Sequence, residues 1–145
     1  MRGVSADQLL GLPIRLHGIQ LGRAIDVIVD TTTWRVLGFD ALCGDDVHRF
    51  LPLAAVRLFA DGLAVGSALM LLEDVELAFY RKRGSTLRSL RGRSVKVGTR
   101  DVGALRGLVL GDDGAVAQLV VSSPEGERRI PVDDRVAVDA HATAA

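Results

Sequence analysis

The chain contains one short pattern twice, and this internal repeat constrains the fold more than any other feature. Residues 21–42 and 102–121 each contain a glycine, a run of branched aliphatic residues, a polar turn and a second aliphatic run. Residues 9–30 align without a gap on residues 90–111, and one gap in each of two later turns extends the alignment. The matched positions include Leu9 with Leu90, Gly11 with Gly92, Ile14 with Val95, Gly22 with Gly103, Phe39 with Leu119 and Leu51 with Ile130. The repeat predicts two similar structural units.

Each unit has the pattern of short antiparallel strands, because β-branched and alternating apolar runs are separated by turn residues. The strands expected in the first unit cover residues 14–17, 22–29, 36–42, 48–51, 57–59 and 63–65. In residues 27–29 and 108–110, neighbouring side chains are expected to point alternately into the core and into solvent. Strands this short favour a small barrel that closes its own edges.

The expected fold class is therefore all-β, with two small antiparallel β-barrel-like units packed with approximate twofold symmetry. Residues 1–66 form the first unit, 67–86 a linker, 87–140 the second unit and 141–145 a disordered tail. The linker has a helical period, in which Leu71, Leu72, Val75, Ala78 and Phe79 form one apolar stripe. A helix is expected there, and an extended form of residues 74–80 is the alternative.

Chain length gives a physical reason for the repeat. A chain of 145 residues is large enough for one domain or two very small ones. A single barrel of about half that length is near the lower size limit at which a core stabilises itself. Two similar units can share burial by packing against each other, as identical subunits do in a dimer.

The first unit resembles the PRC-barrel family in residues 9–42 and in "RFLPLAAV". The shared pattern is an opening Leu-x-Gly, a glycine before the second strand, a "DVIVD" strand end and a late proline. Residues 87–121 and "RRIPVDDRVAV" resemble it more weakly, because Gly107 and Gly111 stand where Asp26 and Asp30 stand in the first unit. The resemblance implies a fold rather than an activity. The family includes the cytoplasmic part of the photosynthetic reaction-centre H subunit and the C-terminal domain of a ribosome maturation factor.

Candidate catalytic and metal-binding patterns are weak. His17, His48 and His141 lack metal-ligand spacing, and Cys43 has no cysteine partner. The paired aspartates at 45/46, 112/113 and 133/134 stand at turns, where aspartate serves backbone geometry. We therefore expect no catalytic residue, metal or cofactor. The N-terminus lacks a signal-peptide pattern, and no apolar run approaches the roughly 20 residues of a membrane span, so a cytoplasmic location is expected.

One basic segment stands out although the charges of the whole chain cancel. Residues 81–106 contain nine basic residues and the single acid Asp101. The candidate anion- or partner-binding residues are Arg81, Lys82, Arg83, Arg88, Arg91 and Arg93.

Three hypotheses follow for function. The first is a non-catalytic module that binds another macromolecule, with a protein partner and possible homo-oligomers. The second is RNA or ribosome association through the basic segment from Arg81 to Arg106. The third is a small-ligand or enzyme site in a pocket between the two units.

Overall fold

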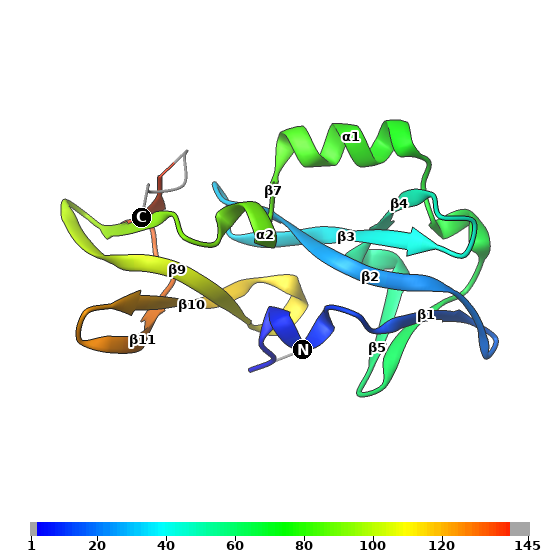
Figure 1. Ribbon diagram of the computed structural model, residues 1–145, viewed down its shortest axis with the longest axis horizontal. Helices are drawn as coiled ribbons and strands as arrows, with labels where there is room; N and C mark the ends of the chain where they lie inside the picture. The colour runs from blue at the N-terminus through cyan, green and yellow to red at the C-terminus, as the bar shows by residue number, and fades with distance from the viewer. Residues whose placement is uncertain (1–2, 140–145) are drawn as a thin grey trace.

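The computed structural model describes residues 3–139, which form two β-sheets (Figure 1). The first sheet has the strand order β4-β3-β2-β1-β6-β5, with β7 paired to β2. The second sheet has the order β11-β10-β9-β8-β12. The strands of the first sheet are β1 (Pro13–Leu16), β2 (Ile19–Asp30), β3 (Arg35–Cys43), β4 (His48–Pro52), β5 (Val56–Phe59), β6 (Gly62–Val65) and β7 (Ser85–Thr86). Those of the second are β8 (Ser94–Val97), β9 (Arg100–Leu110), β10 (Val116–Ser123), β11 (Gly126–Pro131) and β12 (Val136–Val138).

Short helices join and flank the sheets. The 3-10 helices are η1 (Ala6–Leu9), η2 (Leu53–Ala55), η3 (Ala68–Met70) and η4 (Asp112–Gly114). The α-helices are α1 (Asp74–Arg83) and α2 (Leu87–Leu90). Each strand expected in the first unit is present, with bounds that differ by a few residues. The mostly β architecture is therefore confirmed.

The strand pairings of the two sheets match residue by residue along the repeat. Ile14 pairs with Gly22 in the first sheet, and their counterparts Val95 and Gly103 pair in the second. The register shifts immediately after each of these pairs, between Ile14 and Arg15 and between Val95 and Lys96. The pairings of the next strands also correspond. In the first sheet the pairs are Val27 with Phe39, Asp26 with Asp40 and Asp40 with Phe50. Their counterparts in the second sheet, in the same order, are Leu108 with Leu119, Gly107 with Val120 and Val120 with Arg129. The sequence alignment is thus also an alignment of hydrogen-bonded registers.

Two matched glycines are required by close approach of the backbone. A Cβ atom at Gly22 would lie 2.4 Å from the carbonyl oxygen of Leu42, and one at Gly103 would lie 2.5 Å from that of Ser122. These distances are far below van der Waals contact, and carbonyl oxygens of a paired strand cannot move aside freely. The two glycines therefore allow β2 and β9 to pair closely with the strands beside them.

Each sheet is extended by a segment from the other half of the chain. Ser5 bridges to Val109 of β9, and the amide of Leu110 donates to the carbonyl of Val4 at 2.8 Å. In the other direction, β7 pairs with β2 through Thr86 opposite Ile28 and Ser85 opposite Val29. Ser5 and Thr86 occupy matched positions in the repeat, so the exchange is reciprocal.

The apolar core is shared in the same way. One cluster of buried side chains includes Leu9, Val27, Leu90, Leu108 and Val121, and so draws on both halves of the chain. Trp34 is also buried there, and its carbonyl accepts from the amide of Val116 at 2.8 Å. Trp34 thus lies where β3 and β10 meet.

Two features differ from a pair of closed antiparallel barrels. Among residues 3–139, the strand pairing leaves β4 and β5 as the ends of one sheet and β11 and β12 as the ends of the other, so the expected edge closure is wrong. The pair β1–β6 is parallel, whereas β12 pairs antiparallel with β8. The reason is an extra strand: the turn at Asp61 folds β6 back between β5 and β1, so β6 runs antiparallel to β5 and parallel to β1.

The expected alternation between core and solvent is also wrong at the centre of β2 and β9. Val27 and Ile28 are both fully buried, as is Leu108, and Val109 is nearly so. Val27 and Leu108 face the shared core. Ile28 is covered from the opposite side by a second apolar cluster with Phe50 and Leu77, whereas Val109 is opposite Ser5 of the exchanged N-terminal segment.

The linker is helical in part, over η3 and α1; Leu71 and Leu72 of the expected stripe pack against the core, but Val75, Ala78 and Phe79 are exposed. Leu77 is the buried residue of α1, while Val75 and Phe79 are 72% and 56% exposed. Tyr80 stacks on Phe50 with a centroid distance of 4.1 Å and so fixes the opposite side of the helix to the sheet. The expected disordered tail, residues 141–145, lies outside the described residues.

Candidate functional site

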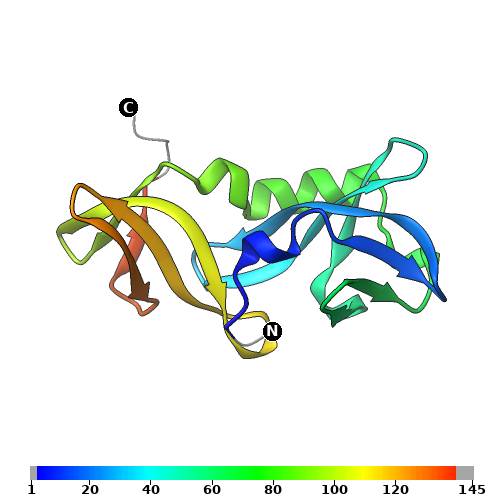
Figure 2. The ribbon, with the colours of Figure 1, turned by 60° about the horizontal axis from the view of Figure 1, so that its bottom comes forward.

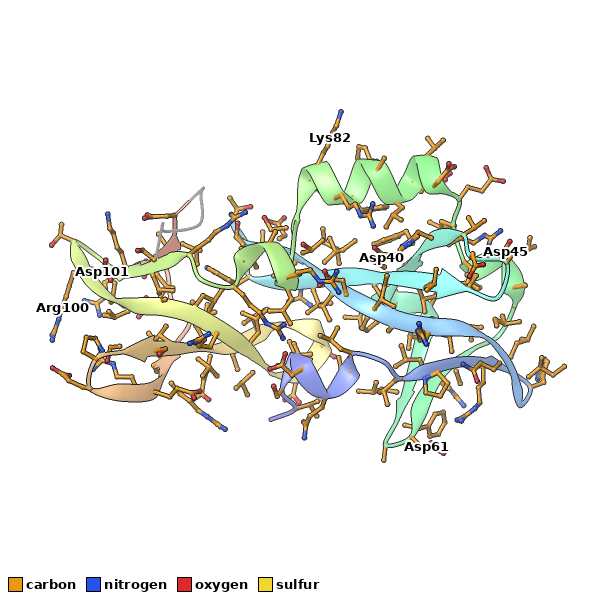
Figure 3. The ribbon with its side chains drawn as sticks, in the orientation of Figure 1. Asp40, Asp45, Asp61, Lys82, Arg100 and Asp101 are labelled. Atoms are coloured by element: carbon orange, nitrogen blue, oxygen red, sulfur yellow. The ribbon has the colours of Figure 1, made fainter. Side chains whose placement is uncertain are left out.

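The basic residues of the segment 81–106 do not all lie on one surface of the protein. Lys82 lies on the last turn of α1 and points away from the sheet, whereas Arg100 lies at the distant tip of β9 (Figure 3). Arg83 ends α1, Arg88 lies on α2, and Arg91 and Arg93 lie between α2 and β8. The six candidate residues thus lie at the end of α1, on α2 and in the turn after α2.

Arg81 fastens α1 to the first sheet. Its guanidinium forms an ion pair with Asp40, whose side chain is only 4% exposed. The other oxygen of that carboxylate lies 2.9 Å from His48 Nδ1. A buried carboxylate requires such partners, because an unpaired charge away from water is costly. The role of Arg81 in the structure is thus internal.

The arginines around α2 also contact the rest of the chain. Arg91 forms an ion pair with Asp7 of η1. Arg93 donates from Nε to the carbonyl of Ser89 at 2.9 Å. The backbone amide of Arg88 donates to Asp26 Oδ1 at 3.3 Å, while its side chain is exposed. These contacts hold the exchanged segments in place.

A different cationic site forms on the second sheet. Arg106 of β9 meets Arg128 and Arg129 of β11 around a hollow of about 330 Å³. We call this site the cationic hollow, and its lining residues are Ser5, Asp7, Arg106, Gly107, Val120, Glu127, Arg128 and Arg129. Within residues 3–139, Arg106, Arg128 and Arg129 form no ion pair.

Arg128 and Arg129 are not among the candidate residues predicted from sequence, although the repeat contains a signal for them. The repeat aligns Arg129 with Phe50, a large apolar residue of the first unit, and the two occupy the same register position. A cation at the position of a buried aromatic residue indicates that the second unit exposes a surface that the first unit covers.

Comparison of the matched surfaces confirms this difference. In the first sheet, Asp40 and Phe50 are covered by α1 through Arg81 and Tyr80. In the second sheet, the matched Val120 and Arg129 are partly buried and exposed, respectively. Figures 1 and 2 show α1 along the outside of the first sheet and, in the described residues, no helix over β10 and β11. The cationic hollow thus lies on a sheet surface that no helix of residues 3–139 covers.

A pocket of about 520 Å³ lies where the two halves of the chain meet. Its lining is Arg35, Val36, Leu37, Leu53, Ala54, Val56, Leu58 and Asp113. Its two charged residues are Arg35 and Asp113, and the guanidinium of Arg35 donates a hydrogen bond to the backbone carbonyl of Asp113. The remaining lining residues are aliphatic and carry no group for acid–base or nucleophilic chemistry.

The weak metal and catalytic candidates have structural contacts. In residues 3–139, no group of three or more His, Cys, Asp or Glu side chains could hold a metal ion. His48 contacts Asp40, Cys43 is buried as a free thiol, and His141 lies outside the described residues. Asp46 and Asp113 have positive φ angles of 62° and 56°, as turn residues do.

Asp45 shows how these turn aspartates are used. Its carboxylate accepts two hydrogen bonds from Arg49, at 2.9 and 2.8 Å, and one from the amide of Val47. These bonds, with that from Arg49 foremost, lower the pKa of Asp45 to about 2. The residue therefore stabilises the β3–β4 turn as a carboxylate and has no properties of a general acid or base near neutral pH.

Comparisons with known proteins identify no relative. No family model matches the chain, and no curated protein matches it. Among the described residues, no helix combines the length and apolar character needed to cross a membrane.

Proposed function

We propose that this chain is a non-catalytic module of two PRC-barrel-like units that binds a protein partner. The two units are related by an approximate twofold axis near the bridge between Arg35 and Ala115, which are themselves matched residues of the repeat. The matched registers and the reciprocal exchange of Ser5 and Thr86 support this arrangement. The partner docks on the cationic hollow and the sheet surface around it.

The main support for this proposal is that no helix of the described residues covers the outer surface of the second sheet. The first unit demonstrates how such a surface is covered, because α1 lies on the matched strands. There the sheet supplies the carboxylate of Asp40 and the helix supplies the guanidinium of Arg81. In the second unit Arg106, Arg128 and Arg129 line the hollow, and Arg129 stands at the position of Phe50. A helix with carboxylates toward the sheet is the complement of that surface.

The chemistry of arginine supports an acidic protein partner. Guanidinium groups bind carboxylates in a bidentate geometry and stack on aromatic rings, and arginine is enriched at protein interfaces. The wide separation of Lys82 from Arg100 gives little support to a continuous track for an RNA backbone (Figure 3). We therefore rank the acidic helix of a partner protein above RNA.

The experiment compares two variants with the same change in charge. In the hollow variant, Arg106, Arg128 and Arg129 are replaced by Ser; in the control variant, Lys82, Lys96 and Arg100 are replaced by Ser. Each full-length protein is immobilised, and proteins captured from cells of the source organism are quantified by mass spectrometry with and without nuclease.

We expect at least one protein to be captured about tenfold less by the hollow variant, as loss of a charge-pair hot spot predicts. The control variant should capture it like the wild type, and nuclease should not release it. The proposal is wrong if no captured protein depends on the hollow, or if nuclease removes every partner that does.

A further inference from the structure

Helix α1 has a second apolar side that nothing in the described residues covers. Leu77 and Tyr80 hold one side against the sheet, while Val75, Ala78 and Phe79 are exposed. Their spacing places these three residues together on one face of the helix. Figure 2 shows that α1 lies along the outside of the molecule, so this face is directed outward.

The segment before the helix also has exposed apolar side chains. Leu69 of η3 is 86% exposed, and Met70 is 42% exposed. Of the seven large apolar side chains that are exposed among residues 3–139, four lie in this region. Concentrated exposure of this kind marks an interaction surface, whereas scattered exposed apolar residues do not. We call Leu69, Met70, Val75, Ala78 and Phe79 the outer stripe.

The charges at the two ends of α1 indicate what covers the outer stripe. Asp74 and Glu76 lie in the first turn of the helix, and Arg81, Lys82 and Arg83 lie in the last. Arg81 is paired with Asp40, whereas Lys82 and Arg83 form no ion pair within the described residues. The exposed part of the helix is therefore acidic at its start and basic at its end.

A helix with this charge order is complementary to an antiparallel copy of itself. Antiparallel packing places the acidic turn of one copy beside the basic turn of the other at both ends, whereas parallel packing would place like charges together. Ala78 lies near the middle of α1, where its small side chain permits close approach of the helix axes. Val75 and Phe79 flank it.

We infer that the outer stripe binds a second copy of this chain, with the two α1 helices antiparallel across a twofold axis near Ala78. The interface is isologous, because each copy contributes the same surface. It is also small, so the dimer is weak and forms at micromolar concentrations. This inference goes beyond the proposed function, because the outer stripe and the cationic hollow lie on different sheets.

Analytical ultracentrifugation of the full chain from about 1 to about 100 µM tests the dimer. We expect a reversible monomer–dimer equilibrium. Phe79→Glu should weaken it at least tenfold, because the glutamate would be desolvated in an apolar contact. Ile19→Glu is the matched control, since Ile19 is 68% exposed but lies in the first sheet away from α1. It should leave the equilibrium unchanged.

Cysteine cross-linking tests the antiparallel geometry. In a Cys43→Ser background, Ala78→Cys should form an intermolecular disulfide under mild oxidation, because matched positions near the twofold axis approach each other. Asp74→Cys should not, because it lies about 6 Å along the helix from Ala78 and hence about 12 Å from its own copy. Parallel packing would instead allow both.

Several results would overturn the inference. A chain that stays monomeric over the whole concentration range would do so, even if it bound lipid vesicles or another protein through Phe79. A dimer unaffected by Phe79→Glu, or one cross-linked equally by Asp74→Cys, would also contradict it. Circular dichroism of each variant checks that α1 is retained.

Discussion

Replacement of the two matched glycines by alanine tests the repeat at the level of packing. In Gly22→Ala, the new Cβ would lie 2.4 Å from the Leu42 carbonyl oxygen and 2.9 Å from the Cα of Cys43. In Gly103→Ala, it would lie 2.5 Å from the Ser122 carbonyl oxygen. Both contacts are with backbone atoms of a paired strand, so relief requires the strands to separate. We expect both variants to be destabilised.

The magnitude follows from overpacking and, at one site, from backbone strain. Forcing an extra methyl group into a packed site costs about 1–3 kcal/mol. Gly103 also has a φ of +131°, which alanine rarely adopts, so its replacement costs about 1–3 kcal/mol more. For a chain of this size, each kcal/mol lowers the melting temperature by roughly 3 °C. Gly22→Ala should therefore lower it by about 3–9 °C, and Gly103→Ala by up to about 18 °C.

Differential scanning calorimetry and urea unfolding measure these changes. Gly66→Ala is the control, because a Cβ at Gly66 would have no atom within 4 Å and its φ is not positive. It should change the melting temperature by less than about 2 °C, as surface substitutions usually do. If Gly22→Ala or Gly103→Ala behaved like this control, the close approach of the strands, and with it the structural equivalence of the two units, would be refuted.

Two further predictions concern the exchange of segments and a turn. Cleavage after Gly84 should leave neither half soluble and monomeric, because it separates β7, Leu87 and Leu90 from β2, and Ser5 from β9. Mixing the two halves should restore a dispersed amide NMR spectrum. Dispersed spectra from two separate monomeric halves would contradict this prediction. Asp45 should titrate near pH 2 by carboxyl NMR, and Arg49→Gln should raise that midpoint toward the ordinary 3.8. Because the pKa of Asp45 is lower in the folded than in the unfolded protein, the Asp45–Arg49 pair stabilises the fold fully above about pH 4 and loses its contribution as the pH falls toward 2. An unchanged titration midpoint of Asp45 in Arg49→Gln would show that Arg49 does not cause the low pKa.

The repeat could be predicted from sequence because its determinants are local. Gly11 and Gly92 have φ angles of 85° and 87°, and the amide of each donates to the matched carbonyls of Ala24 and Leu105. Such glycines are required wherever the backbone turns in this way, so they identify the register without knowledge of the rest of the fold. The apolar runs beside them then predict the strands of both units.

What covers each strand could not be predicted, because it depends on contacts distant in sequence. Alternation along residues 27–29 shows which side chains share a face but not whether both faces are buried. Ile28 is buried by Leu77 of α1, and Val109 lies opposite Ser5. The apolar stripe of the linker could likewise be identified, but not which side of α1 meets the sheet, because stacking of Tyr80 on Phe50 decides that.

The reciprocal exchange explains how a small protein can leave so much surface open. Ser5 extends the second sheet and Thr86 extends the first sheet. The shared core is therefore completed between the two units, and neither unit needs its outer surface for it. One outer surface has gained α1, and the helix itself presents the outer stripe. The other carries Arg129 where the first has Phe50, and no helix of the described residues lies over β10 and β11. Surface positions that do not contribute to the shared core are free to differ in charge and polarity, and we place the two binding surfaces at such positions.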